Sequence, residues 1–114
     1  MTKRSAPATE RNREAILSVL QNYLPNQGTV LEIASGTGQH AVFFALQLTP
    51  RFWLPTDLDP TNMASIAAWR EEADVANLLL PRQLDVRDSS WLIDCDLPAP
   101  ISAIVNINMS VSYT

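Results

Sequence analysis

Three acidic residues and a pair of glycines are the positions in this sequence best placed to do chemistry. Glu32 lies within an apolar stretch that leads into Gly36 and Gly38. Asp57 follows a second apolar stretch, roughly 20 residues beyond Gly38, and Asp85 closes a third. A carboxylate only accepts hydrogen bonds, so one at the end of a strand can take both hydroxyl protons of a ribose. The pattern therefore indicates a site for a nucleotide-type ligand.

Residues 30–41, VLEIASGTGQHA, indicate how the glycines are positioned. An apolar run, a turn of small residues and a second apolar stretch are typical of a strand, a tight turn and a helix. Glycine is needed where φ is positive or where the backbone must touch a ligand. The helix would point its unpaired N–H groups at whatever lies above the turn. The stretch therefore predicts the start of a nucleotide-binding βαβ unit.

Apolar spacing and helix boundary signals predict the remaining elements. Helices are expected at residues 10–24, with Thr9 as N-cap, from the glycine turn to residue 48, and at residues 60–73, with Asp59 as N-cap. Strands are expected at residues 29–33, 52–54, 83–86 and 101–107, with a short helical turn at 89–93. Residues 1–8 would form a flexible arm and residues 9–114 one domain. This order predicts an α/β fold with a parallel sheet and helices on its faces.

The three acidic residues should meet at one edge of this sheet, because ligands bind at the carboxyl ends of parallel strands. We expect Glu32, Asp57 and Asp85 to line one crevice, with the glycine turn between them. A carboxylate in an apolar strand is costly to bury without a partner. Either a cation or hydrogen-bond donor pairs with Glu32, or its site is open to the ligand. His40 lies within the same turn, and capping or packing is a more ordinary role for it than that of a general base.

The composition argues against several classes of protein. A formal net charge of −4 gives no broad attraction to phosphate backbones, so nucleic acid is not an expected partner. No apolar run approaches the roughly 20 residues of a membrane span, and no secretory signal is recognisable at the N-terminus. Cys95 is the one cysteine, and its acidic neighbours Asp94 and Asp96 disfavour a reactive thiolate. A single cysteine fits a reducing, cytoplasmic compartment. No metal-ligand cluster is predicted.

Two nucleotide-binding alternatives stay open at this point. Residues 36–41 also fit the GxGxxG/A fingerprint of a dinucleotide site, so an NAD(P)-binding oxidoreductase is the first alternative. Glu32 counts against it because the strand of that fingerprint normally runs apolar into the first glycine. A helix before the first strand counts against it as well. The second alternative is a non-catalytic nucleotide-binding module.

The stretch 30–41 resembles motif I of the class I methyltransferases that use S-adenosylmethionine. Glu32 matches the acidic residue of that motif, Ala34 stands where its first glycine often is, and Gly36 and Gly38 match the others. The segments WLPTDLDP and LDV look like the second and third motifs. More closely, the chain resembles one small methyltransferase-like family of unknown substrate, from about residue 6 to residue 109. That likeness rests on ERN at 10–12, EIASGTGQHA, PTDLDP, SIAAW and INM.

The resemblance implies an S-adenosylmethionine-dependent methyltransferase that acts on an unknown small molecule or protein. Glu32 would hold the ammonium group of the methionine end. Asp57 would bind the ribose, and Asp85 would lie near the adenine. The backbone would approach the cofactor at Ser35, Gly36 and Gly38. The substrate-side candidates are Asn12, Asn106 and Asn108. The resemblance identifies no catalytic residue.

The family pattern also implies a longer domain than this sequence contains. After Met109 the pattern continues with a histidine-containing segment, further helices and further strands. We therefore expect the N-terminal part of a three-layer, Rossmann-like methyltransferase fold, with strand order 3-2-1-4, in a truncated chain. The alternative is a minimal variant completed by a partner chain. In either case strand four would be an exposed apolar edge, which predicts self-association or poor solubility. Truncation would also weaken cofactor binding and abolish turnover.

Overall fold

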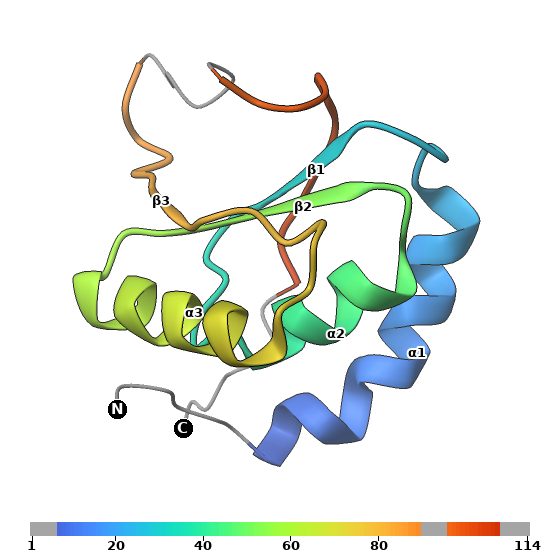
Figure 1. Ribbon diagram of the computed structural model, residues 1–114, viewed down its shortest axis with the longest axis horizontal. Helices are drawn as coiled ribbons and strands as arrows, with labels where there is room; N and C mark the ends of the chain where they lie inside the picture. The colour runs from blue at the N-terminus through green and yellow to red at the C-terminus, as the bar shows by residue number, and fades with distance from the viewer. Residues whose placement is uncertain (1–6, 90–95, 108–114) are drawn as a thin grey trace.

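The computed structural model describes residues 7–89 and 96–107, and Figure 1 shows its elements. In chain order these are α1 (Pro7–Tyr23), β1 (Thr29–Glu32), α2 (Gln39–Gln47), β2 (Phe52–Asp57), α3 (Pro60–Ala73), β3 (Arg82–Gln83) and β4 (Ile101–Val105). The four strands form one parallel sheet in the order β3-β2-β1-β4. This confirms the predicted parallel α/β fold and its strand order.

β1 lies at the centre of the sheet and decides where a ligand site can form. Leu31 of β1 pairs with Leu54 of β2 on one side and with Ile104 of β4 on the other. The strands run outward from β1 to β2 and β3, and the chain then returns to the other side of β1 to add β4. The order of strands thus reverses between β1 and β4. In parallel α/β sheets, ligands bind outside the carboxyl ends of the strands at such a point.

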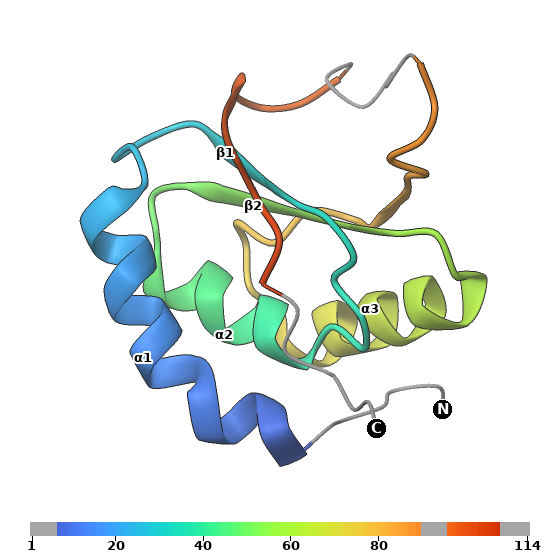
Figure 2. The ribbon, with the colours of Figure 1, turned by 180° about the vertical axis from the view of Figure 1, so that it is seen from behind.

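One face of the sheet is covered by all three described helices, which lie together on the same side in Figures 1 and 2. The core on this side joins Leu20 of α1 and Phe44 of α2 to Val30 and Trp53 of the sheet. Phe44 is fully buried and its ring lies 5.7 Å from that of Trp53, centroid to centroid. Among residues 7–89 and 96–107, no helix has both the length and the apolar composition needed to cross a membrane.

The opposite face carries a smaller apolar cluster to which none of the described helices contributes. Leu31 and Leu54 are fully buried there and Leu84 nearly so. Leu79 packs against them from the segment before β3, and Leu97 from the segment between β3 and β4. Loop residues therefore help to cover this face. The layer of helices on the other face holds the sheet, and with it the carboxyl ends of the strands, in place.

Several predicted boundaries shift, for local reasons. α1 begins at Pro7 rather than after a Thr9 cap, because proline suits the first turn of a helix. Residues 7 and 8 of the predicted arm are therefore helical, and the rest of the arm lies outside the described residues. β4 ends at Val105, two residues earlier than predicted.

β2 is longer than predicted because Pro55 does not break it. The N–H of Trp53 points away from β1 and donates to Asn77 O at 2.9 Å. Pro55, two residues on, directs its nitrogen to the same side. The ladder to β3 begins only at Thr56, so no hydrogen bond is lost at Pro55.

β3 is shorter than the predicted strand at residues 83–86 and ends at Gln83. The backbone N–H of Arg87 donates to Asp85 Oδ1 at 3.0 Å, and the N–H of Asp88 donates to Asp85 O at 3.0 Å. Asp85 thus begins a turn rather than closing a strand. The predicted helical turn at 89–93 lies, except for its first residue, outside the described residues, as does Cys95.

Candidate functional site

The glycine turn leads from the end of β1 to the start of α2 and requires an unusual backbone. Gly36 has φ of 69° and Gly38 has φ of 94°, both in the left-handed region. Ala34, which stands where related motifs often have glycine, has φ of 56°. An L-residue is strained there by contact of its Cβ with the backbone. The turn therefore uses three positive φ values within five residues, at two of which glycine relieves the strain.

Gly38 also lets the turn lie directly against α3. A Cβ at this position would be 2.7 Å from the Cα of Ile66, which is a backbone atom and cannot turn aside. On the same helix, the Ser65 hydroxyl donates to Thr37 O at 2.6 Å. The close approach of α3 therefore explains why glycine is required, apart from any ligand.

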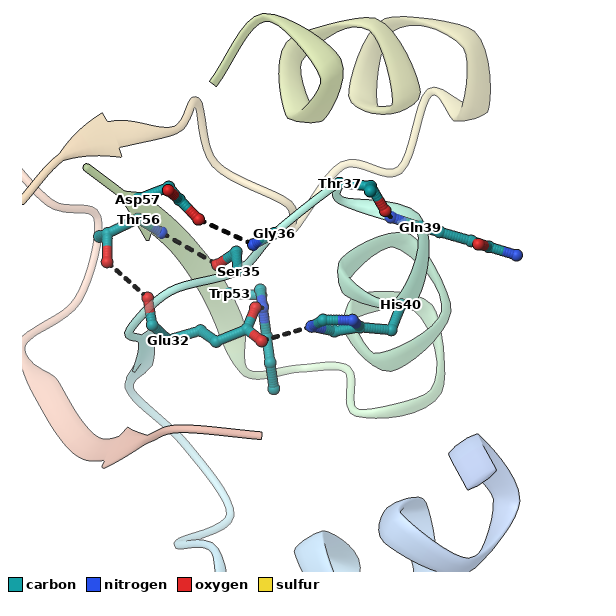
Figure 3. A network of polar contacts seen from close by, with 9 residues as sticks. All are labelled: Glu32, Ser35, Gly36, Thr37, Gln39, His40, Trp53, Thr56 and Asp57. Atoms are coloured by element: carbon teal, nitrogen blue, oxygen red, sulfur yellow. Dashed lines mark hydrogen bonds and ion pairs between the residues drawn. The ribbon is translucent and has the colours of Figure 1, made fainter. Parts of the chain in front are cut away.

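β2 supports the turn from its other side, as Figure 3 shows. The backbone N–H of Gly36 donates to Asp57 Oδ2 at 2.9 Å. Ser35 donates from its N–H to Thr56 O at 2.8 Å, and its hydroxyl accepts from the Thr56 N–H at 3.1 Å. The Thr56 hydroxyl donates to Glu32 O at 2.6 Å. Ser35, predicted to let the backbone approach a cofactor, therefore also continues the sheet past the end of β1.

Glu32 and His40 form a buried pair across the turn (Figure 3). Glu32 is fully buried, and its Oε2 contacts His40 Nε2 while its Oε1 accepts from Trp53 Nε1 at 3.1 Å. The structure thus answers the question that the sequence left open: donors from α2 and β2 pair with the carboxylate. The imidazole lies 5.7 Å from the Phe44 ring, between centroids.

The pair determines the charge of His40. Burial alone would lower the pKa of His40, but the negative charge of Glu32 and the hydrogen bond to it raise the pKa, and the net shift is upward from 6.5. The imidazolium form of His40 is therefore favoured beside the Glu32 carboxylate. An imidazole held in this way binds its partner across the turn and is poorly suited to accept a proton from a substrate.

Asp57 and Asp85 line one cavity of about 230 Å³ at the carboxyl edge of the sheet. Ile33 and Ala34 of the turn form another part of its wall. This confirms that these two carboxylates share a crevice beside the glycine turn. The expectation that Glu32 lines the same crevice is wrong, since its side chain is fully buried and directed toward His40 and Trp53.

The two carboxylates in this cavity differ in their environment. Asp57 is 8% exposed and already accepts from Gly36, from the Asp59 N–H at 3.0 Å and from Asn62 Nδ2 at 3.4 Å. A carboxylate has about four acceptor positions, so Asp57 retains room for one further donor. Asp85 accepts from Arg87 Nε at 2.9 Å and Nη2 at 2.7 Å, and these hydrogen bonds lower the pKa of Asp85 to about 2. Asp85 is therefore ionised across the physiological pH range.

The substrate-side candidates do not form one cluster among the described residues. Asn12 is an exposed residue of α1. Asn106 follows β4 and lines a separate, largely apolar groove of about 390 Å³ between β4 and α1, in which Asn12 takes no part. Asn108 lies outside the described residues.

The role of His40 as the partner of Glu32 is the main feature that sequence reasoning missed. The two residues lie eight positions apart, on opposite sides of the turn. The signal was present, because an acidic residue in an apolar strand needs a partner and the chain contains one histidine, just beyond the glycines. Trp53 could not have been found in this way, since its indole N–H reaches Glu32 only through the pairing of β1 with β2.

The fold is similar to two solved methyltransferase structures. One is described as coclaurine N-methyltransferase bound to N-methylheliamine and SAH, with a TM-score of 0.61 and 12% identity over 79% of this chain. The other is described as PKMT2 from Rickettsia typhi in complex with AdoHcy, with a TM-score of 0.55 and 20% identity over 88% of this chain. The matches span 27% and 18% of those two proteins. The chain therefore has the fold of one part of these larger proteins.

A family model also matches almost the whole sequence. The match extends over residues 3–111 and includes the glycine turn, the Asp57 and Asp85 positions and the segment that follows β4. The family has no assigned function, in line with the predicted resemblance to a family of unknown substrate. The chain belongs to the family described as "Protein of unknown function (DUF938)".

Proposed function

We propose that this domain binds S-adenosylmethionine and that the protein transfers the methyl group of that cofactor to a small-molecule or protein acceptor. The observation that carries the proposal is the cavity at the carboxyl edge of the sheet, where Asp57 and Asp85 lie beside the glycine turn. Its volume of about 230 Å³ is below the range of sites that enclose a whole drug-sized ligand. The cavity suits the nucleoside end of the cofactor.

The residues around this cavity fit a nucleoside by their chemistry. Asp57 can accept one more hydrogen bond, which suits a ribose hydroxyl. Asp85 is an ionised hydrogen-bond acceptor that forms an ion pair with Arg87. Such an acceptor suits the exocyclic amino group of an adenine. Apolar walls from Ile33, Leu58 and Leu84 suit the faces of a base.

The methionine end of the cofactor would lie toward the turn and Glu32. Ser35, Gly36 and Gly38 form the backbone of this turn, and the helix that follows begins at Gln39. Support comes from the two solved methyltransferases of similar fold, whose descriptions name SAH or AdoHcy as the bound molecule. Because this chain spans a small share of both proteins, activity and acceptor are part of the proposal.

The chemistry that the cofactor supplies is a methyl group on a sulfonium centre, open to in-line displacement. The contribution of this chain is to hold the donor in a fixed orientation, which by itself accounts for much of the rate enhancement in reactions of this type. Asn12, Asn106 and Asn108 stay candidates for the acceptor side. A cytoplasmic location and no nucleic-acid partner are further parts of the proposal, supported by the single cysteine and the net charge of −4. Self-association through β4 is another part, supported by the exposed Ile104 side chain on this edge strand.

Isothermal titration calorimetry of the 114-residue chain with S-adenosylhomocysteine and, separately, with NAD tests the cofactor assignment. We expect binding of S-adenosylhomocysteine and none of NAD. Asp85→Asn should weaken that binding about tenfold, the usual effect of losing a hydrogen bond to a charged group. The matched control is Glu71→Gln on the exposed surface of α3, which removes the same charge away from the cavity.

Two results would contradict the assignment of the cofactor to this cavity. Binding of NAD with no response to S-adenosylhomocysteine would favour the oxidoreductase alternative. Equal affinities of Asp85→Asn and Glu71→Gln for S-adenosylhomocysteine would show that the cavity is not part of the cofactor site. Cofactor affinity without methyl transfer in a broad acceptor screen would instead favour the non-catalytic binding module.

A further inference from the structure

The Glu32–His40 pair occupies the carboxylate to which a cofactor ammonium group would bind. Both side chains are buried, and Glu32 Oε2 contacts His40 Nε2 directly. Its other oxygen accepts from Trp53. A second cation could approach this carboxylate only by sharing it with the imidazolium or by replacing it.

His40 is well placed to give way to such a cation. It is the second residue of α2 and so lies at the end of the helix next to the glycine turn. Trp53 packs in the core with Val30 of β1 and Phe44 of α2, whereas His40 is not part of that core cluster. Of the two donors to Glu32, His40 is therefore the one that can change its charge and the one that lies beside the turn.

We propose that His40 serves as an internal counter-cation for Glu32, and that the ammonium group of the cofactor replaces its charge when it binds. The imidazolium releases its proton to solvent as the ammonium arrives, so Glu32 keeps one positive partner before and after binding. This inference rests on the proposed function, because it needs an ammonium group at Glu32. It adds a positioning residue and a proton release that the site alone does not imply.

The surroundings of His40 favour competition at Glu32 over other electrostatic effects. From β1, Glu32 is the charged group in contact with the imidazole and the one whose charge raises the pKa of His40. From α1, Arg13 lies over the Phe43 ring, 4.5 Å from its centroid. From β2, the Asp57 carboxylate accepts from the Gly36 N–H. Trp53, also on β2, carries no charge. From α3, the residues against the turn are Ser65 and Ile66, which are uncharged.

Calorimetry in buffers of different ionisation enthalpy tests the exchange by counting released protons. Below the folded-state pKa of His40, the dissociation constant for S-adenosylhomocysteine should fall about tenfold per pH unit as the pH rises, the slope for release of one proton. Above that pKa the dependence should flatten. The second probe is 5′-methylthioadenosine, which lacks the amino-acid part and should bind without proton release.

The matched variant is His40→Gln, which keeps a hydrogen-bond donor but cannot titrate. Its affinity for S-adenosylhomocysteine should not depend on pH between about 5.5 and 7.5, and at the acidic end it should exceed that of the wild type. NMR of the wild type needs no variant: the one histidine of the chain should shift toward the neutral form on adding S-adenosylhomocysteine but not 5′-methylthioadenosine.

The outcomes separate this inference from the proposed function. Absence of S-adenosylhomocysteine binding at every pH would refute both. Binding of S-adenosylhomocysteine with no proton release and an unmoved His40 resonance would refute the exchange alone and leave His40 with a structural role. Proton release that persists in His40→Gln would assign the proton to another group and equally refute the exchange.

Discussion

At the scale of single residues, the site contains two groups that are costly for the fold. Glu32 is a fully buried carboxylate that His40 and Trp53 satisfy, and Ala34 is an L-residue in a left-handed conformation. A buried carboxylate destabilises a fold when its partners are removed, and a strained backbone costs free energy on its own; both are found near functional sites. Each of the two therefore gives a prediction about the free energy of unfolding.

The first concerns the dependence of stability on pH. Because the pKa of His40 is raised above 6.5 in the folded chain, its protonation stabilises the fold fully below pH 6.5. That contribution is lost as the pH rises through the folded-state pKa. Denaturant unfolding of the wild type and His40→Gln should show a difference that is largest in acid and shrinks with rising pH. A difference that is constant with pH would contradict the charged pair.

A companion variant isolates the source of the shift. Glu32→Gln removes the charge and leaves the burial, so the pKa of His40 should fall below that of the wild type. At a pH low enough to keep His40 protonated, the substitution should also destabilise the fold by roughly 3–5 kcal/mol, because a buried imidazolium loses its partner. NMR titration of the single imidazole gives the pKa directly.

The second residue-scale prediction concerns Ala34, with φ of 56°. Ala34→Gly should stabilise the fold by about 0.5–1 kcal/mol, since the strain relieved exceeds the chain entropy that glycine adds. The control is Ala64→Gly on the exposed face of α3, which should destabilise by about 1 kcal/mol. Chemical denaturation measures both. If the two substitutions destabilise equally, Ala34 is not strained.

At the scale of elements, the turn is defined by what packs on it from three sides. α3 lies against Gly38, β2 binds the Gly36 N–H through Asp57, and α2 begins at Gln39. The position of the turn therefore depends on the packing of α3 as much as on its own sequence. Gly38 is the residue at which this dependence is most direct.

Gly38→Ala should destabilise the fold by about 2–4 kcal/mol, because it adds backbone strain and an overpacked contact with the Ile66 Cα. Gly28→Ala is a useful comparison, since a Cβ there would lie 2.5 Å from Ser102 Oγ, a side-chain atom. Adding Ser102→Gly should partly rescue Gly28→Ala, whereas no trimming of the Ile66 side chain should rescue Gly38→Ala. Thermal unfolding measures all of these. Full stability of Gly38→Ala would show that α3 can move away from the turn.

Local signals in the sequence predict some elements better than others, for physical reasons. α3 was predicted with its bounds, because Asp59 and Pro60 mark its start locally and the Asp59 side chain does accept from the Thr61 N–H. The sequence predicts β2 only to residue 54, because whether Pro55 is tolerated depends on where β3 begins. Parallel strands alone predict that Asp57 and Asp85 lie at one edge of the sheet, although Asp85 lies in a turn beyond β3 and not within the strand. The direction of the Glu32 side chain does not follow from parallel strands, because it depends on α2 and β2 packing on β1.

At the scale of the whole molecule, β4 is an edge strand of the described sheet, and Ile104 on it is 56% exposed. An exposed apolar edge favours pairing with another chain. We predict concentration-dependent association, which Ile104→Lys should weaken about tenfold or more. The control is Leu46→Lys on α2, where the native side chain is also 56% exposed. Sedimentation velocity measures the association. A wild type that stays monomeric at all concentrations, or an equal effect of both substitutions, would contradict this role of β4.

The placement of β1 between β2 and β4 has a consequence for the order in which the chain assembles. Thr29 pairs with Phe52 and with Ile101. Phe52 leaves the ribosome soon after Thr29, whereas the separation in sequence between Thr29 and Ile101 is about threefold longer. Closing the longer loop costs only about 1 kcal/mol more than closing the shorter one, so the equilibrium is hardly affected. The timing is different: a nascent chain can complete β1, α2 and β2 while one flank of its central strand still has no β4. Until β4 arrives, that flank is open to chaperones or to a neighbouring nascent chain.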